Sequence, residues 1–105
     1  MASSSIRIRS KRRKQKAQIR ILIAHPMENG RFHDPETGQI IPAHFIQQLR
    51  IFLNGNLVIE ADLGGSISKD PYFSFILNAV KAGDKVTVSW VDNSGIRDSR
   101  DHVIK

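Results

Sequence analysis

The sequence predicts an all-β protein, an antiparallel β-sandwich of about seven strands in one domain. Along most of the chain apolar residues alternate with polar ones at a period of two, which is the pattern of half-buried strands. No stretch of useful length shows the period of about 3.6 residues that marks an amphipathic helix. Short segments rich in Gly, Asn and Asp separate the apolar runs, as turns require. A length of 105 residues, 40% of them hydrophobic, fits one globular domain, and short strands joined by such turns favour a sandwich.

The strands can be assigned in chain order. Ile6 and Ile8 alternate with arginines and could form an edge strand. The clearest strand comes late in the chain, where Val86, Val88 and Trp90 should face the core. Besides the N-terminal edge strand, we expect strands at residues 18–25, 47–53, 57–63, 72–77, 85–91 and 98–104.

Asn54-Gly55 marks a β-hairpin between two of these strands. A two-residue loop would mix apolar and charged side chains on one face. A three-residue loop with Gly55 in the left-handed conformation pairs Ile51 with Leu57 and keeps the apolar side chains together, so we predict that loop. It leaves Phe52 and Val58 on the outer face, where they either form a partner surface or are simply exposed or covered by a loop.

The net charge of +6 comes from one end of the chain. The first 20 residues contain eight basic and no acidic residues, and the rest of the chain has a net charge of −2. We therefore divide the chain into a basic N-terminal tail, residues 1–17, which could include an edge strand, and a sandwich domain, residues 18–105. Such a tail could contact nucleic acid or anionic lipid, or it could be a solvated segment that meets an acidic partner.

A long polar connection, residues 28–39, interrupts the strand pattern. Connections of this length are often binding loops, and His25 and His44 lie near its two ends. No two of the four histidines are within seven residues of each other, and the chain has no Cys, so we expect no metal site, no cofactor and no catalytic residue. His25 and His44 could approach each other where the connection starts and ends. The alternative to a metal site there is that they cap strand ends and hydrogen-bond to the backbone.

Two patterns at the ends of this connection are specific when taken together. The stretch His25-Pro26-Met27-Glu28 is followed by Gly30, and later Ile41-Pro42 is followed by Phe45-Ile46. With four further stretches, these patterns resemble the SoxZ family, the Z subunit of the sulfur-oxidation (Sox) carrier complex SoxYZ. The similar stretches are residues 22–30, 41–46, 53–56, 61–63, 70–75 and 82–93, and they cover most of residues 18–93.

The resemblance implies an immunoglobulin-like antiparallel β-sandwich and a non-catalytic scaffold subunit. It implies a heterodimer with SoxY, whose cysteine, on a Gly-rich C-terminal segment, carries the sulfur species derived from thiosulfate. The SoxYZ carrier would contact other Sox enzymes transiently, and no nucleic acid or membrane would be involved. The resemblance also implies a location in the periplasm. The apolar run 21–24 is too short for a signal peptide core, so we expect co-export with SoxY. The absence of Cys fits, since a second thiolate could exchange with the carried sulfur species.

The candidate partner-binding residues lie at the two ends of the long connection, on the outer face of the predicted hairpin and at the start of the strand 72–77. Two other functions stay open: a generic secreted immunoglobulin-like binding module, and a nucleic-acid-binding protein that uses the basic tail, whose affinity would fall steeply with salt. The predicted partner-binding residues are His25, Pro26, Met27, Arg31, His44, Phe45, Phe52, Val58 and Tyr72.

Overall fold

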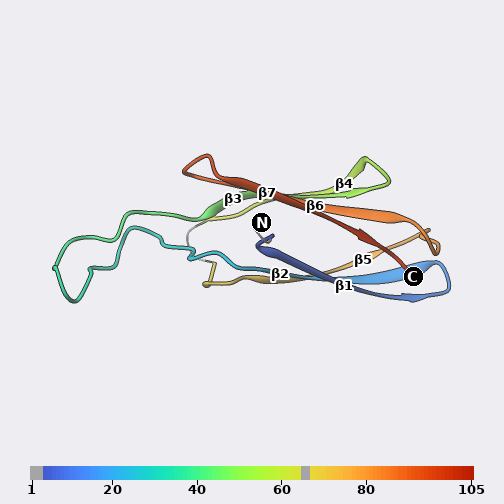
Figure 1. Cartoon of the computed structure of the whole chain (residues 1–105), viewed down its shortest axis with the longest axis horizontal. Helices are drawn as coiled ribbons and strands as arrows, with labels where there is room; N and C mark the ends of the chain where they lie inside the picture. Colours follow the sequence, from blue (N-terminus) through green and yellow to red (C-terminus); the bar gives the residue numbers. More distant parts are fainter. Residues whose placement is uncertain (1–3, 65–66) are drawn as a thin grey trace.

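The computed structural model describes residues 4–64 and 67–105, and in this part of the chain it contains seven antiparallel strands and no helix. It therefore contains no helix there that could span a membrane. The strands form two layers that face each other (Figure 1). All seven predicted strands are confirmed, with small differences at their ends. They are β1 (Ile6–Arg13), β2 (Lys16–Ile23), β3 (Ile46–Leu53), β4 (Asn56–Asp62), β5 (Tyr72–Leu77), β6 (Lys85–Asp92) and β7 (Arg97–Val103).

The strand order is that of an immunoglobulin-like sandwich with one strand exchanged. The first sheet has the order β1-β2-β5 and the second has the order β4-β3-β6-β7. In constant-type immunoglobulin domains the fourth strand belongs to the first sheet, whereas here β4 pairs with β3. The predicted all-β sandwich is thus confirmed, and the short β3–β4 connection explains why β4 stays beside β3.

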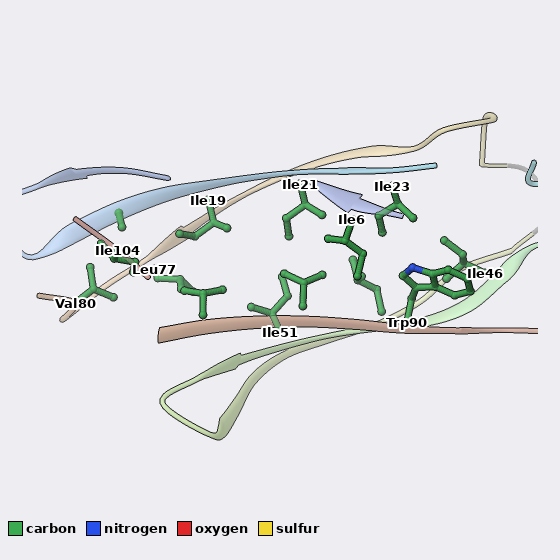
Figure 2. Close-up of a cluster of buried hydrophobic side chains, with 14 of the residues drawn as sticks. Ile6, Ile19, Ile21, Ile23, Ile46, Ile51, Leu77, Val80, Trp90 and Ile104 are labelled. Carbon is green, nitrogen blue, oxygen red and sulfur yellow. The ribbon is translucent and has the colours of Figure 1, made fainter. Parts of the chain in front are cut away.

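The core lies between the two sheets and is built mainly from branched aliphatic side chains (Figure 2). Ile19, Ile21 and Ile23 alternate along β2 and are fully buried, as the period of two predicts. Ile51 and Trp90 face them from the second sheet, and the indole of Trp90 lies at the end of the core nearest the long connection. The predicted core position of Trp90 is therefore confirmed.

Strand β1 contains most of the basic residues of the N-terminal segment. It pairs with β2 over its whole length, from Ile6 opposite Ile23 to Arg13 opposite Lys16. Ile6 is fully buried in the core. Because side chains alternate across a strand, the arginines at positions 7 and 9 point to the outer face of the first sheet.

The predicted three-residue hairpin loop between β3 and β4 is wrong. Asn54 and Gly55 form a two-residue turn with φ angles of 51° and 84°, and Leu53 lies opposite Asn56. The register then shifts by one residue, because Ile51 pairs with Ile59 and Val58 is the extra residue of a β-bulge. Two left-handed residues match the twist of the strands, and the bulge returns the apolar side chains of β4 to the core.

A row of polar contacts closes the sandwich between β1 and β7. The Asp98 carboxylate accepts hydrogen bonds from the hydroxyls of Ser4 and Ser5 at 3.0 and 2.7 Å. Arg100 donates to the backbone carbonyl of Ile6 at 2.8 Å, and the ring of His102 bonds to the Ser10 hydroxyl at 2.7 Å. These bonds tie the edge strand of the first sheet to the edge strand of the second.

The long connection projects from one end of the sandwich as an extended two-stranded loop (Figure 1). We call residues 28–44 the projecting loop. Isolated β-bridges pair Glu28 with His44 and His33 with Ile40. Gly30 has a φ of 81°, and a Cβ at this position would lie only 3.3 Å from the Ala43 Cβ. The glycine of the His-Pro-Met-Glu pattern is thus required by the backbone conformation and by the close approach of the two sides of the loop.

Candidate functional site

The base of the projecting loop is organised around His25. Its backbone N–H donates to the Asp70 carboxylate at 3.0 Å, and its carbonyl accepts from the Asp70 N–H at 2.9 Å. The side chain is buried, with both ring nitrogens in use: Nδ1 accepts from the Met27 N–H at 3.1 Å, and Nε2 lies 3.0 Å from the Asp92 Oδ2. A nitrogen that accepts an N–H bond has no proton of its own, so we assign the proton of the neutral ring to Nε2, which donates to Asp92.

Asp92, at the end of β6, joins the two sides of the loop. Only 2% of this residue is exposed. Its Oδ2 accepts from the Nε2 atoms of both His25 and His44, at 3.0 and 2.8 Å. Its Oδ1 accepts from the backbone N–H groups of Ser94 and Ile96 at 3.0 and 2.9 Å. Four donors therefore surround one buried carboxylate, which fixes both histidines and the turn after β6.

These bonds also decide the charge of the carboxylate. Burial by itself would raise the pKa of Asp92, but the hydrogen bonds from His25, His44 and the two backbone N–H groups outweigh burial and lower the pKa below its ordinary value. Asp92 is therefore an anion at neutral pH. His44 is the accessible member of the cluster, since about a third of its side chain is exposed.

The same three side chains could be considered as a metal site, because their candidate ligand atoms all lie within 4.8 Å of one another. A histidine that binds a metal normally donates its other ring N–H to an acceptor. Here the other nitrogen of His25 faces the Met27 N–H, which is a donor. Binding a metal through Nε2 would place two donors against each other, so the arrangement favours a hydrogen-bonded cluster over a metal site.

An open cavity of about 600 Å³ lies beside the cluster. Its lining includes His25 and His44 together with Trp90, whose indole N–H donates to the Ser5 hydroxyl at 3.1 Å. The rings of His25 and Trp90 meet edge to face, with centroids 5.1 Å apart. The cavity thus has an aromatic wall, and the polar groups of His25, Trp90 and Asp92 beside it are already hydrogen-bonded.

Comparison with known proteins identifies the family. A family model described as "Sulphur oxidation protein SoxZ" matches residues 6–103, nearly the whole chain. The chain belongs to the SoxZ family. None of the curated proteins compared with it matches. Membership confirms the resemblance noted from the sequence and places this SoxZ chain in the sulfur-oxidation system. The match begins at Ile6, so the family pattern includes strand β1.

The structure brings some of the predicted partner-binding residues of this SoxZ chain together at the base of the projecting loop. His25 and His44 meet at Asp92, and the Phe45 backbone bonds to Asn93 at 2.8 Å. Pro26 lines the cavity beside the cluster. Met27 is buried, with φ at 51°, and its sulfur accepts from the Ile46 N–H.

The other predicted residues lie elsewhere. Arg31 is exposed on the projecting loop. Phe52 and Val58 lie on the outer face of the second sheet, where 45% of Val58 is exposed. Tyr72 starts β5 on the outer face of the first sheet and is 58% exposed. The predicted set is therefore not one surface, and its binding roles remain predictions.

The central residue of the cluster was missed. Asp92 does not stand out in the sequence, because Asp-Asn before Ser-Gly is also an ordinary turn signal. Asp70 was missed for a similar reason, since Asp-Pro also marks a turn. The backbone-capping alternative for the histidines is only partly right: the Met27 N–H bonds to His25, but both rings also bond to a carboxylate.

Acid should destabilise this SoxZ chain. The pKa values of Asp92 and Asp98 are both lowered; burial opposes the shift in each case, and hydrogen bonds outweigh it. The pKa of His102 is lowered by burial and by the nearby charges of Arg100 and Lys105. For all three groups the unfolded chain has the higher pKa and takes up protons first as the pH falls, so stability falls with it.

We therefore expect a small loss of stability as the pH drops below about 6.5, from His102, and a steep loss below about 4, from the aspartates. The urea midpoint measured between pH 7 and pH 3 tests this. Asp98→Asn should make the acid-side loss shallower. A urea midpoint that stays constant down to pH 3 would show that these carboxylates do not contribute to stability.

Proposed function

We propose that the chain is the non-catalytic scaffold subunit of a SoxYZ carrier. In this role it pairs with SoxY, and the sulfur intermediates of thiosulfate oxidation stay covalently bound to the SoxY cysteine while other Sox enzymes visit the complex. The observation that carries the proposal is the family match over residues 6–103. A cysteine-free chain is consistent with it, because the chain has no thiol to compete for the carried sulfur.

The cluster at the loop base supports a scaffold role. Asp92 already accepts four hydrogen bonds, and both ring nitrogens of His25 are occupied. A general base or nucleophile needs a free, accessible position next to its substrate. These groups instead hold the projecting loop in one orientation relative to the sandwich, which is what a preformed binding surface needs.

We further propose that the projecting loop and the cavity beside it face SoxY or its cysteine-bearing segment. The guanidinium of Arg31 could donate hydrogen bonds to an anionic sulfur species on that segment. His44 could do so through Nδ1 in its protonated form, because its Nε2 already bonds to Asp92. Phe32 and Ile40 are exposed on the loop, at 62% and 58%, and supply apolar contact area. The complex would function in the periplasm, with SoxY providing the export signal.

The first test is assembly. The chain is produced together with SoxY, and the mixture is analysed by size-exclusion chromatography with light scattering. A one-to-one heterodimer that survives dilution to micromolar concentration is expected. Two separate proteins at that concentration would contradict the proposal.

A further inference from the structure

The outer face of the first sheet is strongly basic. Six cations point outward from two adjacent strands, while the alternate residues of β2 are buried in the core. Strands β1, β2 and β5 contain no Asp or Glu. In the part of the chain that the structure describes, none of the six takes part in an ion pair. They are Arg7, Arg9, Lys11, Arg13, Lys16 and Arg20, and we call this surface the basic face.

The pairing of the strands concentrates this charge. Arg9 lies directly opposite Arg20, and Arg13 lies directly opposite Lys16. Like charges in directly opposed positions destabilise a sheet. These two like-charge pairs therefore oppose the stability of the sandwich, and an external anion is the physical partner that would compensate their repulsion.

Exposed apolar side chains lie beside the cations on the basic face. Leu22 pairs with Arg7 on one side and with Tyr72 on the other, and Gln18 pairs with Ile76. Leu22, Tyr72 and Ile76 are all exposed, at 40%, 58% and 66%. A shallow hollow of about 240 Å³ is lined by Leu22, Tyr72 and three arginines, Arg7, Arg9 and Arg20. Arginine and tyrosine around an apolar centre are typical of protein interfaces.

We propose that the basic face is a docking surface for an acidic protein, whose carboxylates pair with the arginines and whose apolar residue contacts Leu22 and Tyr72. Arginine binds carboxylates and phosphates alike through two parallel N–H bonds. The exposed Leu22, Tyr72 and Ile76 beside the arginines favour a protein surface, whose anionic groups are carboxylates, over a phosphate backbone. A single-stranded nucleic acid would need several aromatic side chains for base stacking, and Tyr72 is the one aromatic residue on this face. This surface is separate from the projecting loop, and the proposal does not depend on the proposed function.

The test uses the full chain and a fluorescently labelled copolymer of glutamate and tyrosine, with binding followed by anisotropy at about 0.15 M ionic strength. The double variant Arg9→Glu/Arg20→Glu should weaken binding by at least about tenfold. The control Lys69→Glu/Arg97→Glu changes the net charge equally at exposed positions outside the first sheet, and should weaken binding less than about threefold. Equal losses in the two variants would overturn the proposal.

Two further measurements separate the other possible occupants. A DNA duplex or phosphatidylglycerol vesicles that bind more tightly than the copolymer at the same ionic strength would overturn the proposal, because the face would then recognise phosphates. Self-association of the chain that is lost in the double variant would also overturn it. If the DNA duplex and the vesicles both bind more weakly than the copolymer, and the chain is monomeric, the proposal is supported.

A melting experiment tests the charge argument independently of any ligand. The single variant Arg9→Glu places opposite charges across the strand pair, and its melting temperature should rise by about 2 to 4 °C. The double variant again has like charges opposite each other and should melt within about 2 °C of the parent. A lower melting temperature for Arg9→Glu would show that the sandwich needs this arginine, against the proposal.

Discussion

Replacing Asp92 with alanine is expected to lower the free energy of unfolding by about 3 to 5 kcal/mol, the range for removing one partner of a buried charged network. The carboxylate is 2% exposed and accepts four hydrogen bonds. Without it, the Nε2–H of His25 and the backbone N–H groups of Ser94 and Ile96 lose their acceptor inside the protein, and each buried donor left unpaired costs about 1 to 3 kcal/mol. Urea unfolding followed by the fluorescence of the single tryptophan, Trp90, measures the loss.

Two comparison variants make this result specific. Asp62→Ala removes an exposed carboxylate on β4 and should change stability by less than about 0.5 kcal/mol. Asp92→Asn keeps one acceptor oxygen, which can face either the two histidines or the two backbone N–H groups, and its N–H₂ then faces the other two donors. It should therefore cost less than alanine and still more than about 1 kcal/mol. A loss below about 1 kcal/mol for Asp92→Ala would mean that the cluster does not anchor the loop.

Removing residues 31–42, the outer part of the projecting loop, is expected to weaken the proposed heterodimer with SoxY by about a hundredfold, which corresponds to about 2.7 kcal/mol. In the shortened chain an inserted Asn-Gly turn connects Gly30 to Ala43, two residues whose backbones already approach closely. The residues removed, 31–42, are mostly exposed, so the free energy of unfolding should change by less than about 1 kcal/mol. Titration calorimetry with SoxY measures the affinity.

Matched point variants distinguish the loop from the outer face of the second sheet. Phe32→Ser/Ile40→Ser removes two exposed apolar side chains from the loop, and Leu57→Ser/Val58→Ser removes two from β4, with similar exposure in both pairs. The loop pair should weaken the heterodimer by at least about tenfold and the β4 pair by less than about threefold. The reverse result would assign the SoxY contact to the outer face.

The strands could be predicted because alternation in this chain is strict where a side chain must enter the core. For β2, a shift of one residue would have moved Ile19, Ile21 and Ile23 from the core to the outer face. The hairpin at Asn54-Gly55 was predicted wrongly because a sequence gives no sign of a bulge: Val58 is apolar like its neighbours, and only the pairing of Ile51 with Ile59 shows that it is the extra residue. Local patterns therefore fix which residues form strands more firmly than how those strands align.

The candidate site was predictable only in part, for a different reason. His25 and His44 were selected because they flank a long polar connection, and the structure brings their rings to 4.7 Å between centroids. Asp92 lies 48 residues beyond His44 along the chain, and its place in the cluster depends on β6 pairing with β3. A long-range contact of this kind cannot be read from spacing. The basic face was only partly visible in the sequence: residues 1–17 were predicted as a basic tail that could include an edge strand, but the pairing of β1 with β2, which places Arg9 opposite Arg20, could not be read from it.

The most direct measurement of the central claim is thiosulfate oxidation by a reconstituted Sox system from which single components are omitted. If the chain is the passive half of the carrier, it should show no turnover alone, SoxY should show little without it, and activity should saturate when the two are present in equal amounts. Oxidation of thiosulfate by the chain alone, or full activity of the system without it, would contradict the account.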